Sequence, residues 1–331
     1  MAEVIQGVFP GGEGPDGTLP GVSAVAALNL SPKPGDAEGN LLLAEREIAA
    51  ALALEPSLRY VVLPELFTCA YSALECVYQY AEDAECGESA RFFTGLAKEF
   101  GIYIAYGFPE GVASSPIGVF DSANLVGPEG VVATYRKRNL VGTTTEHFVF
   151  TPGTESQIVE TGGIRVSLAV CWDMGFPEMA REAALGGASL ILGPAAWREP
   201  WGFQYDLSCA ARALGNGVYV ASANQTGVYP EVSFATPGHV YGPGGNTRLA
   251  LLRRCERRNG GPHNLPVLES PLRQHPRKER RGGAAGDRPL RVRHRATAGF
   301  GTTCVEQKTG RSLQKVGEKP ETSRGGSRTA Q

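Results

Sequence analysis

The sequence predicts a layered α/β domain followed by a basic segment that cannot build a core of its own. Short apolar runs of strand length alternate with runs whose apolar residues recur at helical spacing, which is typical of α/β domains. Residues 1–246 carry 12 Lys and Arg against 27 Asp and Glu, whereas residues 247–331 carry 20 against 7. Of the 27 Phe, Trp and Tyr residues, only Phe300 lies in the basic segment. Because few large apolar groups remain there to offset the entropy lost on ordering, we expect the folded domain to span residues 22–246.

The first half of this domain is expected to contain three strands and two helices. Val22–Leu30 is a mostly apolar run of strand length that ends at a proline-rich loop. Leu41–Leu54 has apolar residues at helical spacing and stops before a proline, so we expect a helix there. Tyr60–Leu63 is typical of a short buried strand. Phe92–Leu96 marks a second helix, which a glycine ends, and the strand Ile102–Tyr106 follows it.

The second half begins with an expected hairpin. Ala123–Val126 and Val131–Tyr135 flank a Gly-Pro-Glu-Gly turn sequence. Ile164–Val170 is a nearly continuous apolar strand, and Pro177 opens a helix because proline suits the first helical position. Two more strands are expected at Leu190–Leu192 and Val218–Ala221, with a helix at Gln204–Leu214 between them.

Composition excludes several classes of protein. No run of about 18 apolar residues is present, which excludes a transmembrane helix, and the N-terminus has no basic region followed by an apolar one, so we expect no secretory signal. Residues 1–21, rich in Gly and Pro, are expected to form a flexible lead-in. We interpret the seven cysteines as reduced thiols of a cytoplasmic protein. Cys69, Cys76 and Cys86 have no histidine nearby, so we expect no metal site.

Three polar residues at the ends of short apolar strands could form a catalytic site: Glu65, Lys137 and Cys171. The ends of strands are where α/β sheets commonly present active-site groups. A turn into a helix at Cys171 would place its sulfur near backbone N–H groups, which lower the pKa of a thiol and stabilise an oxyanion. Each residue also has an ordinary explanation. Cys171 could be a buried structural thiol, Glu65 a solvated carboxylate or an N-cap, and Lys137 part of a charged strand end. Only the combination favours catalysis.

The segments around these residues resemble the nitrilase superfamily of carbon–nitrogen hydrolases, whose members use a Glu–Lys–Cys triad. The resemblance runs in the family's order from about residue 22 to residue 245. It implies a four-layer αββα sandwich that pairs into homodimers or larger homo-oligomers. The matching segments are Leu63-Pro64-Glu65-Leu66-Phe67, Tyr135-Arg136-Lys137, Glu146 with Phe150-Thr151-Pro152-Gly153, Cys171-Trp172-Asp173-Met174-Gly175-Phe176-Pro177-Glu178, Arg212-Ala213 with Asn216, and Ala223-Asn224.

The resemblance also implies a role for each matching residue. Cys171 would be the nucleophile, Glu65 the general base, and Lys137 the group that stabilises the oxyanion together with the backbone N–H of Trp172. Glu146 would orient Lys137 or the substrate amide, although a surface helix carboxylate is the alternative. The implied reaction forms a thioester with loss of ammonia or an amine, and water then hydrolyses the thioester. The resemblance implies neither a metal nor an organic cofactor.

Departures from the family's pattern bear on the substrate. Asp173 follows Trp172 where true nitrilases typically have Glu, which favours a small linear amide or an N-carbamoyl amine as substrate and leaves a small nitrile as the alternative. Gly175 stands where many members that take acidic amides carry Arg. The aromatic residues expected to line the substrate pocket, each of which could equally belong to the core, are Trp172, Tyr71, Phe176 and Trp197.

The basic segment, residues 247–331, departs from the family altogether. Its Arg-rich sequence has no strand or helix periodicity, so it is interpreted either as a disordered tail or as the product of a lost reading frame. In the second case, the last strands of the sandwich would be missing. A nucleic-acid-binding protein that uses this tail is the rival function, but the tail has no aromatic stacking platform and the acidic body would repel phosphates. Nucleic acid is therefore an unlikely partner.

Overall fold

The computed structural model describes residues 2–7, 23–112 and 115–245. All of them belong to one compact unit of the chain. The expectations for residues 247–331, including the missing last strands, lie outside the described residues. No helix of the described part is long and apolar enough to cross a membrane.

The first sheet has six strands, which follow one another in sequence order across the sheet. The strands β2, β3 and β4 are parallel, and the remaining neighbours are antiparallel. Within the range expected to form the lead-in, Ala2–Gly7 pairs along its whole length with β2. The strands are β1 (Ala2–Gly7), β2 (Ser23–Leu28), β3 (Leu58–Val62), β4 (Tyr103–Val112), β5 (Ser115–Gly127) and β6 (Gly130–Arg136).

The second sheet has five strands in the order β13-β10-β9-β8-β7. Its three central strands are parallel, and each edge strand is antiparallel to its neighbour. A separate two-stranded ribbon joins β11 (Gly227–Val228) to β12 (Ser233–Phe234). The strands of the sheet are β7 (Ile158–Thr161), β8 (Ile164–Leu168), β9 (Leu190–Ala195), β10 (Tyr219–Asn224) and β13 (Val240–Tyr241).

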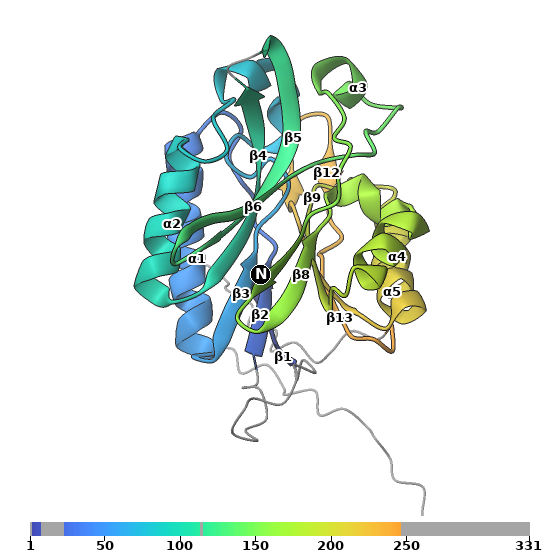
Figure 1. The fold of residues 1–331 in the computed structure, drawn as a ribbon. Helices are drawn as coiled ribbons and strands as arrows, with labels where there is room; N and C mark the ends of the chain where they lie inside the picture. Colours follow the sequence, from blue (N-terminus) through green and yellow to red (C-terminus); the bar gives the residue numbers. More distant parts are fainter. Residues whose placement is uncertain (1, 8–22, 113–114, 246–331) are drawn as a thin grey trace, which may run out of the picture. The chain divides into compact units, whose positions relative to one another are not determined.

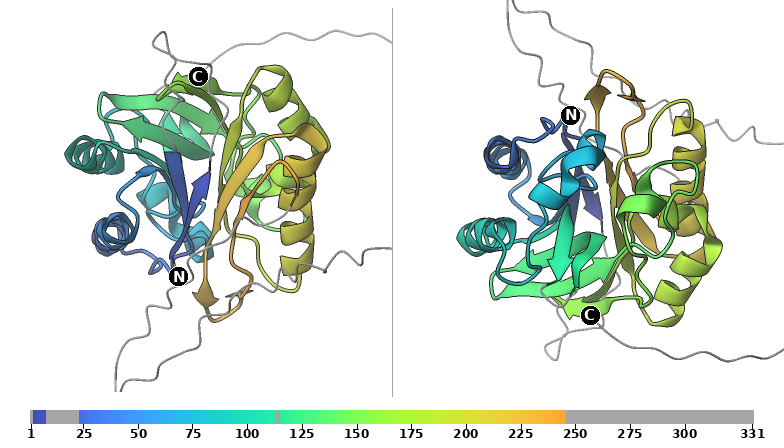
Figure 2. Two further views of the ribbon diagram at one scale, coloured as in Figure 1. Left: turned by 90° about the horizontal axis from the view of Figure 1, so that it is seen from below. Right: turned by 90° about the horizontal axis from the view of Figure 1, so that it is seen from above.

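Two pairs of helices cover the outer faces of the two sheets, so the expected four-layer αββα sandwich is confirmed (Figures 1 and 2). The helices α1 and α2 pack on the first sheet, and α4 and α5 pack on the second. The helices are α1 (Ala37–Leu54), α2 (Glu88–Phe100), the single turn α3 (Glu146–Val149), α4 (Pro177–Leu185) and α5 (Gly202–Asn216), with 3₁₀ turns η1 (Tyr71–Gln79) and η2 (Cys171–Gly175).

Buried side chains of both sheets form one apolar cluster between them, which includes Tyr60 and Val62 of β3 and Leu190 of β9. Two buried asparagines add polar bonds between the sheets. The backbone N–H of Asn224 donates to Asn29 Oδ1 (2.8 Å), and Asn224 Nδ2 donates to the carbonyl of Trp197 (3.0 Å). We refer to Asn29 and Asn224 as the asparagine joint. It fixes the end of β10 beside the end of β2.

Candidate active site

Three strand ends bring Glu65, Lys137 and Cys171 together. Lys137 directly follows β6, whereas Glu65 and Cys171 each lie three residues beyond the end of a strand, β3 and β8. The Nζ atom of Lys137 lies 2.5 Å from Glu65 Oε1, and both side chains are close enough to Cys171 to influence its ionisation. The sequence therefore placed these residues at one site, from two different sheets.

Lys137 is surrounded by carboxylates rather than by solvent. Besides Glu65, its Nζ lies 2.9 Å from Glu146 Oε1 and 3.3 Å from Asp121 Oδ2, and all four side chains are fully buried. Tyr71 donates its hydroxyl proton to Glu146 Oε1 (2.5 Å), and the N–H of Val141 donates to Glu146 Oε2 (2.8 Å). Glu146 is thus buried beside the lysine, not on a helix surface.

Asp121 is a member of this cluster that the sequence did not reveal to us. It lies on β5, whose pairing with β6 places Ser122 opposite Arg136. Extending the expected hairpin by two residues on each strand sets Asp121 opposite Lys137, and the N–H of Lys137 donates to the carbonyl of Asp121 (2.8 Å). The register of the hairpin was the signal that could have found it.

The charges of the cluster shift its pKa values in different directions. Burial alone would lower the pKa of Lys137, but Glu146, Glu65 and Asp121 outweigh burial and raise that pKa well above its usual value. Burial opposes ionisation of Glu146 too, yet Lys137 and the bond from Tyr71 hold its pKa below normal. For Asp121, burial and the charge of Glu65 raise the pKa well above the usual 3.8. Lys137 is therefore charged and Glu146 ionised at neutral pH.

Cys171 occupies a strained backbone position at the start of η2. Its φ angle of 47° lies in the left-handed region that non-glycine residues rarely adopt. Burial, followed by the negative charge of Glu65, raises the pKa of the Cys171 thiol well above its usual value, although the N–H of Ala196 lies against the sulfur and opposes the shift. Our expectation of a lowered thiol pKa is therefore wrong, because burial of the thiol outweighs the nearby N–H group and the charge of Lys137. A neutral thiol needs a base at the moment of attack.

Asp173 fixes the turn that carries Cys171. Its carboxylate accepts bonds from the N–H of Val170 (3.0 Å), the hydroxyl of Tyr135 (2.8 Å), and both the N–H and Nδ2 of Asn139 (2.9 and 2.8 Å). The turn after β8 is thereby tied to the strand that delivers Lys137. The residue that distinguishes this chain from the nitrilase pattern acts here on the architecture of the site.

Two glycines let backbone segments approach the site closely. A Cβ atom on Gly107 would lie 2.5 Å from the backbone nitrogen of Leu66 and 2.6 Å from Glu65 Cα. A Cβ on Gly153 would lie 2.2 Å from the carbonyl oxygen of Arg136. All three distances are shorter than real Cβ contacts, so each position requires glycine for the carboxylate and the lysine to reach their places.

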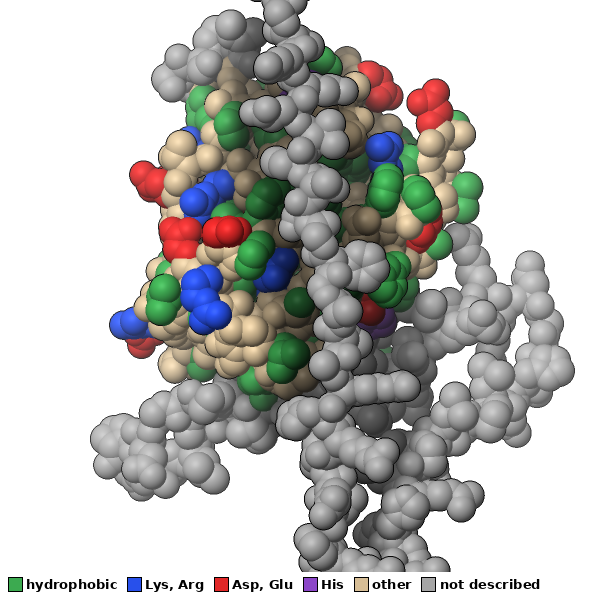
Figure 3. Space-filling view, turned by 90° about the vertical axis from the view of Figure 1, so that its right-hand side faces the viewer, with side chains coloured by type: hydrophobic (Ala, Val, Ile, Leu, Met, Phe, Trp, Pro, Cys, Tyr) green, Lys and Arg blue, Asp and Glu red, His purple; other side chains and the backbone are tan. Residues whose placement is uncertain are grey.

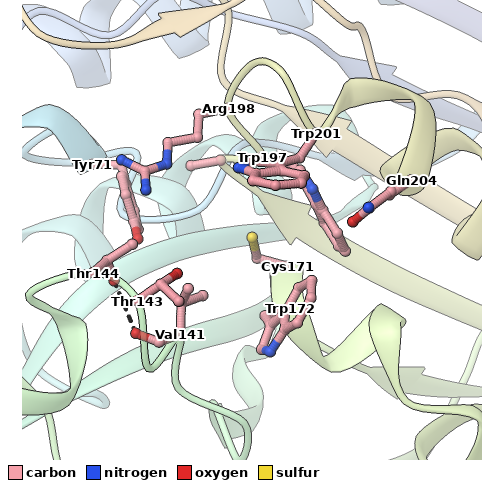
Figure 4. A pocket seen from close by; sticks show the side chains of 11 residues that line it. Tyr71, Val141, Thr143, Thr144, Cys171, Trp172, Trp197, Arg198, Trp201 and Gln204 are labelled. Atoms are coloured by element: carbon pink, nitrogen blue, oxygen red, sulfur yellow. Dashed lines mark hydrogen bonds between the residues drawn. The ribbon is translucent and has the colours of Figure 1, made fainter.

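A pocket of about 220 Å³ opens at the sulfur of Cys171 (Figure 4). Three of the four aromatic residues expected to line it do so, namely Tyr71, Trp172 and Trp197. The fourth, Phe176, is not among the lining residues and instead packs edge-on against Trp172, with 5.9 Å between ring centroids. Lining residues that we did not expect are Val141, Thr143, Thr144, Ala196, Arg198, Trp201 and Gln204.

Arg198 stands where this pocket meets a larger hollow of about 820 Å³. It lines both, as do Tyr71, Thr143 and Thr144, so these residues form the mouth of the pocket. Arg198 is the only charged residue among those lining the pocket, and its half-exposed guanidinium forms no ion pair within the described part of the chain. The pocket is thus apolar and aromatic inside, with one unpaired cation at its mouth.

The three buried carboxylates offer ligand atoms within 4.8 Å of one another, a spacing that a metal ion could use. The ammonium of Lys137 lies within 3.3 Å of an oxygen on each of them. It therefore occupies the position that a cation would take between them. Positive charge at this site comes from the chain itself.

The sequence profile of the carbon-nitrogen hydrolase family matches residues 24–322. The protein named "Probable nitrilase C965.09" of Schizosaccharomyces pombe is 31% identical over 228 residues, which make up 69% of this chain and 83% of that protein. The chain belongs to the carbon-nitrogen hydrolase family. Membership identifies it as a hydrolase of carbon–nitrogen bonds.

Other members of the family include named amidases. The crystal structure of an amidase from Nesterenkonia sp. is 30% identical with a TM-score of 0.60, and the match covers 69% of this chain and 85% of that one. The 2-oxoglutaramate amidase of Bacillus subtilis is 30% identical over 186 residues, or 56% of this chain and 70% of that protein. The family profile extends to residue 322, beyond the last residue whose structure is described.

Proposed function

We propose that this carbon-nitrogen hydrolase cleaves small linear amides through a thioester on Cys171. The observation that carries the proposal is one arrangement: a buried Glu65–Lys137 pair lies behind a cysteine that opens into a small pocket. A volume of 220 Å³ holds on the order of seven water-sized groups, which suits an acyl chain of a few carbons. In a mutant of the amidase from Nesterenkonia sp. AN1, the acetamide moiety of fluoroacetamide is covalently bound to the active-site cysteine.

In the acylation step, Glu65 accepts the thiol proton of Cys171 as the sulfur attacks the carbonyl carbon of the amide. The negative charge that develops on the carbonyl oxygen is stabilised by the ammonium of Lys137 and by the backbone N–H of Trp172. Glu65 then gives its proton to the leaving nitrogen, so that ammonia departs and a thioester remains. Glu146 holds Lys137 in place and is itself held by the hydroxyl of Tyr71.

In the deacylation step, Glu65 takes a proton from a water molecule, and the resulting hydroxide attacks the thioester carbon. The carbon–sulfur bond breaks, the carboxylic acid leaves, and the proton on Glu65 returns to the sulfur of Cys171. The same carboxylate therefore acts as base and then as acid in both halves of the reaction. Each cycle consumes one water and restores the neutral thiol.

The mouth of the pocket suggests which amides fit. A substrate carboxylate cannot lie deep in the site, because the carboxylates around Lys137 would repel it. Arg198 stands at the mouth of the pocket with no ion-pair partner among the described residues, and a guanidinium binds a carboxylate with two parallel bonds. We therefore propose monoamides of short dicarboxylic acids as preferred substrates. In this proposal, Arg198 takes the role of the arginine that many members carry at the position of Gly175.

Ammonia release from succinamate, from an N-carbamoyl amine and from a nitrile tests the reaction. We expect turnover of the amide, an adduct of fluoroacetamide on the Cys171 peptide by mass spectrometry, and neither in Cys171→Ala. Cys209→Ala is the matched control, since that thiol is equally buried but lies on α5. Faster turnover of the nitrile or of the N-carbamoyl amine would replace the amide as the substrate class.

The role of Arg198 is tested with succinamate and its neutral isostere 4-methylpentanamide. Because bonds to a charged group are worth about 1.5–3 kcal/mol, Arg198→Gln should lower kcat/KM for succinamate by about 10- to 100-fold and affect the neutral amide far less. Arg46→Gln on α1 is the control, since that arginine pairs only with Glu47 at the surface. Equal losses on both amides would exclude carboxylate recognition by Arg198.

We also propose that the protein assembles into homo-oligomers through the outer face of α4 and α5. Leu185, Phe203 and Leu214 expose 80, 77 and 61% of their surface there, and Figure 3 views the molecule from this side. Light scattering should show a smaller assembly for Leu185→Glu but not for Leu42→Glu, a control on the opposite helix layer that is 53% exposed. A cytoplasmic location is proposed because Cys86, Cys171 and Cys209 are free thiols.

A further inference from the structure

The site holds more buried negative charge than its one lysine can balance. Glu65, Asp121 and Glu146 have no exposed surface, and each has a carboxylate oxygen within 3.3 Å of Lys137 Nζ. If all three were ionised, the cluster would carry a net charge of –2 out of contact with water, which is very costly. A proton bound to one of the carboxylates removes half of that excess.

The hydrogen bonds of each carboxylate decide which one holds the proton. Glu146 accepts from three donors, namely Lys137, Tyr71 and Val141, so its negative charge is well compensated. Glu65 accepts from Lys137 at 2.5 Å. Asp121 has only the longest contact, at 3.3 Å, and neither of its oxygens has a hydrogen-bond donor among the described residues. Asp121 is therefore the least stabilised as an anion.

A second set of unpaired atoms points to the same residue. Glu65 Oε2 is buried and also has no donor in the described part of the chain. The carboxyls of Asp121 and Glu65 lie within hydrogen-bonding reach of each other, but two carboxylate anions have no proton to share. One proton between them would satisfy both groups at once.

We propose that Asp121 is a protonated carboxylic acid that donates a hydrogen bond to Glu65 Oε2 and positions Glu65 as the base. The effect of Asp121 on catalysis rests on the proposed function, whereas its protonation is independent of that function. Glu65 is then held at both oxygens, by Lys137 at one and by Asp121 at the other, and keeps its negative charge. Asp121 is a positioning residue, because it acts on the reaction through Glu65.

Among the described residues, Lys137 is the one cation that faces Asp121 and favours its ionisation. The groups facing it are Glu65 from the segment after β3, Lys137 from the end of β6, and Glu146 from α3, and burial with the charge of Glu65 raises its pKa. The pair of Arg136 with Glu110 lies on the other side of the sheet, where Ser122 donates to Glu110, since successive side chains of a strand alternate.

The decisive measurement is unfolding by urea as a function of pH, in the full chain and in Asp121→Asn. An aspartate whose pKa is raised by folding stabilises the folded state below its unfolded pKa of 3.8 and loses that contribution as pH rises. Asparagine does not titrate. Between pH 5 and pH 6, the wild-type unfolding constant should therefore rise about tenfold relative to the variant, or about 1.4 kcal/mol. Parallel pH dependences would show that Asp121 is ionised when folded.

Two further readouts keep the proposal testable if one variant fails to fold. The wild-type protein should show the carbonyl stretch of a protonated carboxylic acid in its infrared spectrum, and Asp121→Asn should lack it. Asp121→Leu, which cannot donate a bond to Glu65, should lower kcat about tenfold or more, and asparagine should restore most of that loss through its amide N–H. Equal kcat values in the leucine and asparagine variants would exclude positioning. If no variant or wild type hydrolyses any amide, the proposed function fails, while the unfolding arm still decides the protonation.

Discussion

Replacing Gly107 by alanine should weaken both the fold and the site. Gly107 lies on β4, where its N–H donates to the carbonyl of Pro64 (3.1 Å) and its carbonyl accepts from the N–H of Phe67 (2.8 Å). Two backbone hydrogen bonds therefore hold the loop that carries Glu65 directly against Gly107. A methyl group would meet the backbone of Leu66 and Glu65 at 2.5–2.6 Å.

The size of the effect follows from what must move. Backbone atoms on both sides cannot rotate away as a flexible side chain could, so the loop must shift by about 1 Å to restore an ordinary contact. Overpacking of this kind costs about 1–3 kcal/mol. A displacement of about 1 Å in a catalytic group lowers activity by about 10²-fold. We expect the free energy of unfolding in urea to fall by about 1–3 kcal/mol and kcat/KM for succinamate to fall by about 10²-fold.

Gly95→Ala provides the matched control. Gly95 is an exposed position inside α2, and a Cβ there meets no atom within 4 Å. Alanine should stabilise the protein by about 1 kcal/mol, because glycine is a poor helix former, and should leave activity unchanged. If Gly107→Ala were as stable and as active as the wild type, the close approach of β4 to the Glu65 loop would not constrain the site as described.

Three further predictions concern the charged groups. Lys137→Met should lower the free energy of unfolding in urea by about 3–5 kcal/mol, because Glu65 and Glu146 would be left buried without their cation. A decrease below about 1 kcal/mol would contradict the burial of these charges. Folding lowers the pKa of Glu146, so ionised Glu146 stabilises the folded state. The difference in free energy of unfolding between the wild type and Glu146→Gln should be complete above the unfolded pKa of 4.5 and shrink as pH falls below it. A difference that stays constant with pH would refute this. The raised pKa of Cys171 predicts that its alkylation in Glu65→Gln speeds up with pH without levelling off by pH 8, as followed by mass spectrometry.

Much of the fold could be predicted from the sequence because its elements carry strong local signals. The helix predicted at Leu41–Leu54 is α1, and the hairpin arms predicted around the Gly-Pro-Glu-Gly turn are β5 and β6. Local signals are weaker for short elements held by tertiary contacts. The two-residue strands β11 and β12 could not be predicted, because two residues carry no periodicity.

The site shows the same division between local and distant causes. Glu65, Lys137 and Cys171 could be predicted because each follows an apolar strand, but the side chains that set their ionisation come from elsewhere in the chain. Asp121 lies inside a strand, where a carboxylate looks like a solvated edge residue until Lys137 is placed opposite it. The direction of the thiol pKa depends on burial, which no local pattern reports.

The asparagine joint has a consequence for how the protein is made. Asn29 and Asn224 are 195 residues apart, yet they bond to each other, and the side-chain amide of Asn224 also donates to the carbonyl of Trp197, which lines the pocket. During synthesis, β2 leaves the ribosome long before β10 exists, so it must wait for most of the domain to be translated. Catalytic competence is therefore acquired late, and appearance of activity in a translation reaction would time the closure of the two sheets rather than the folding of the first.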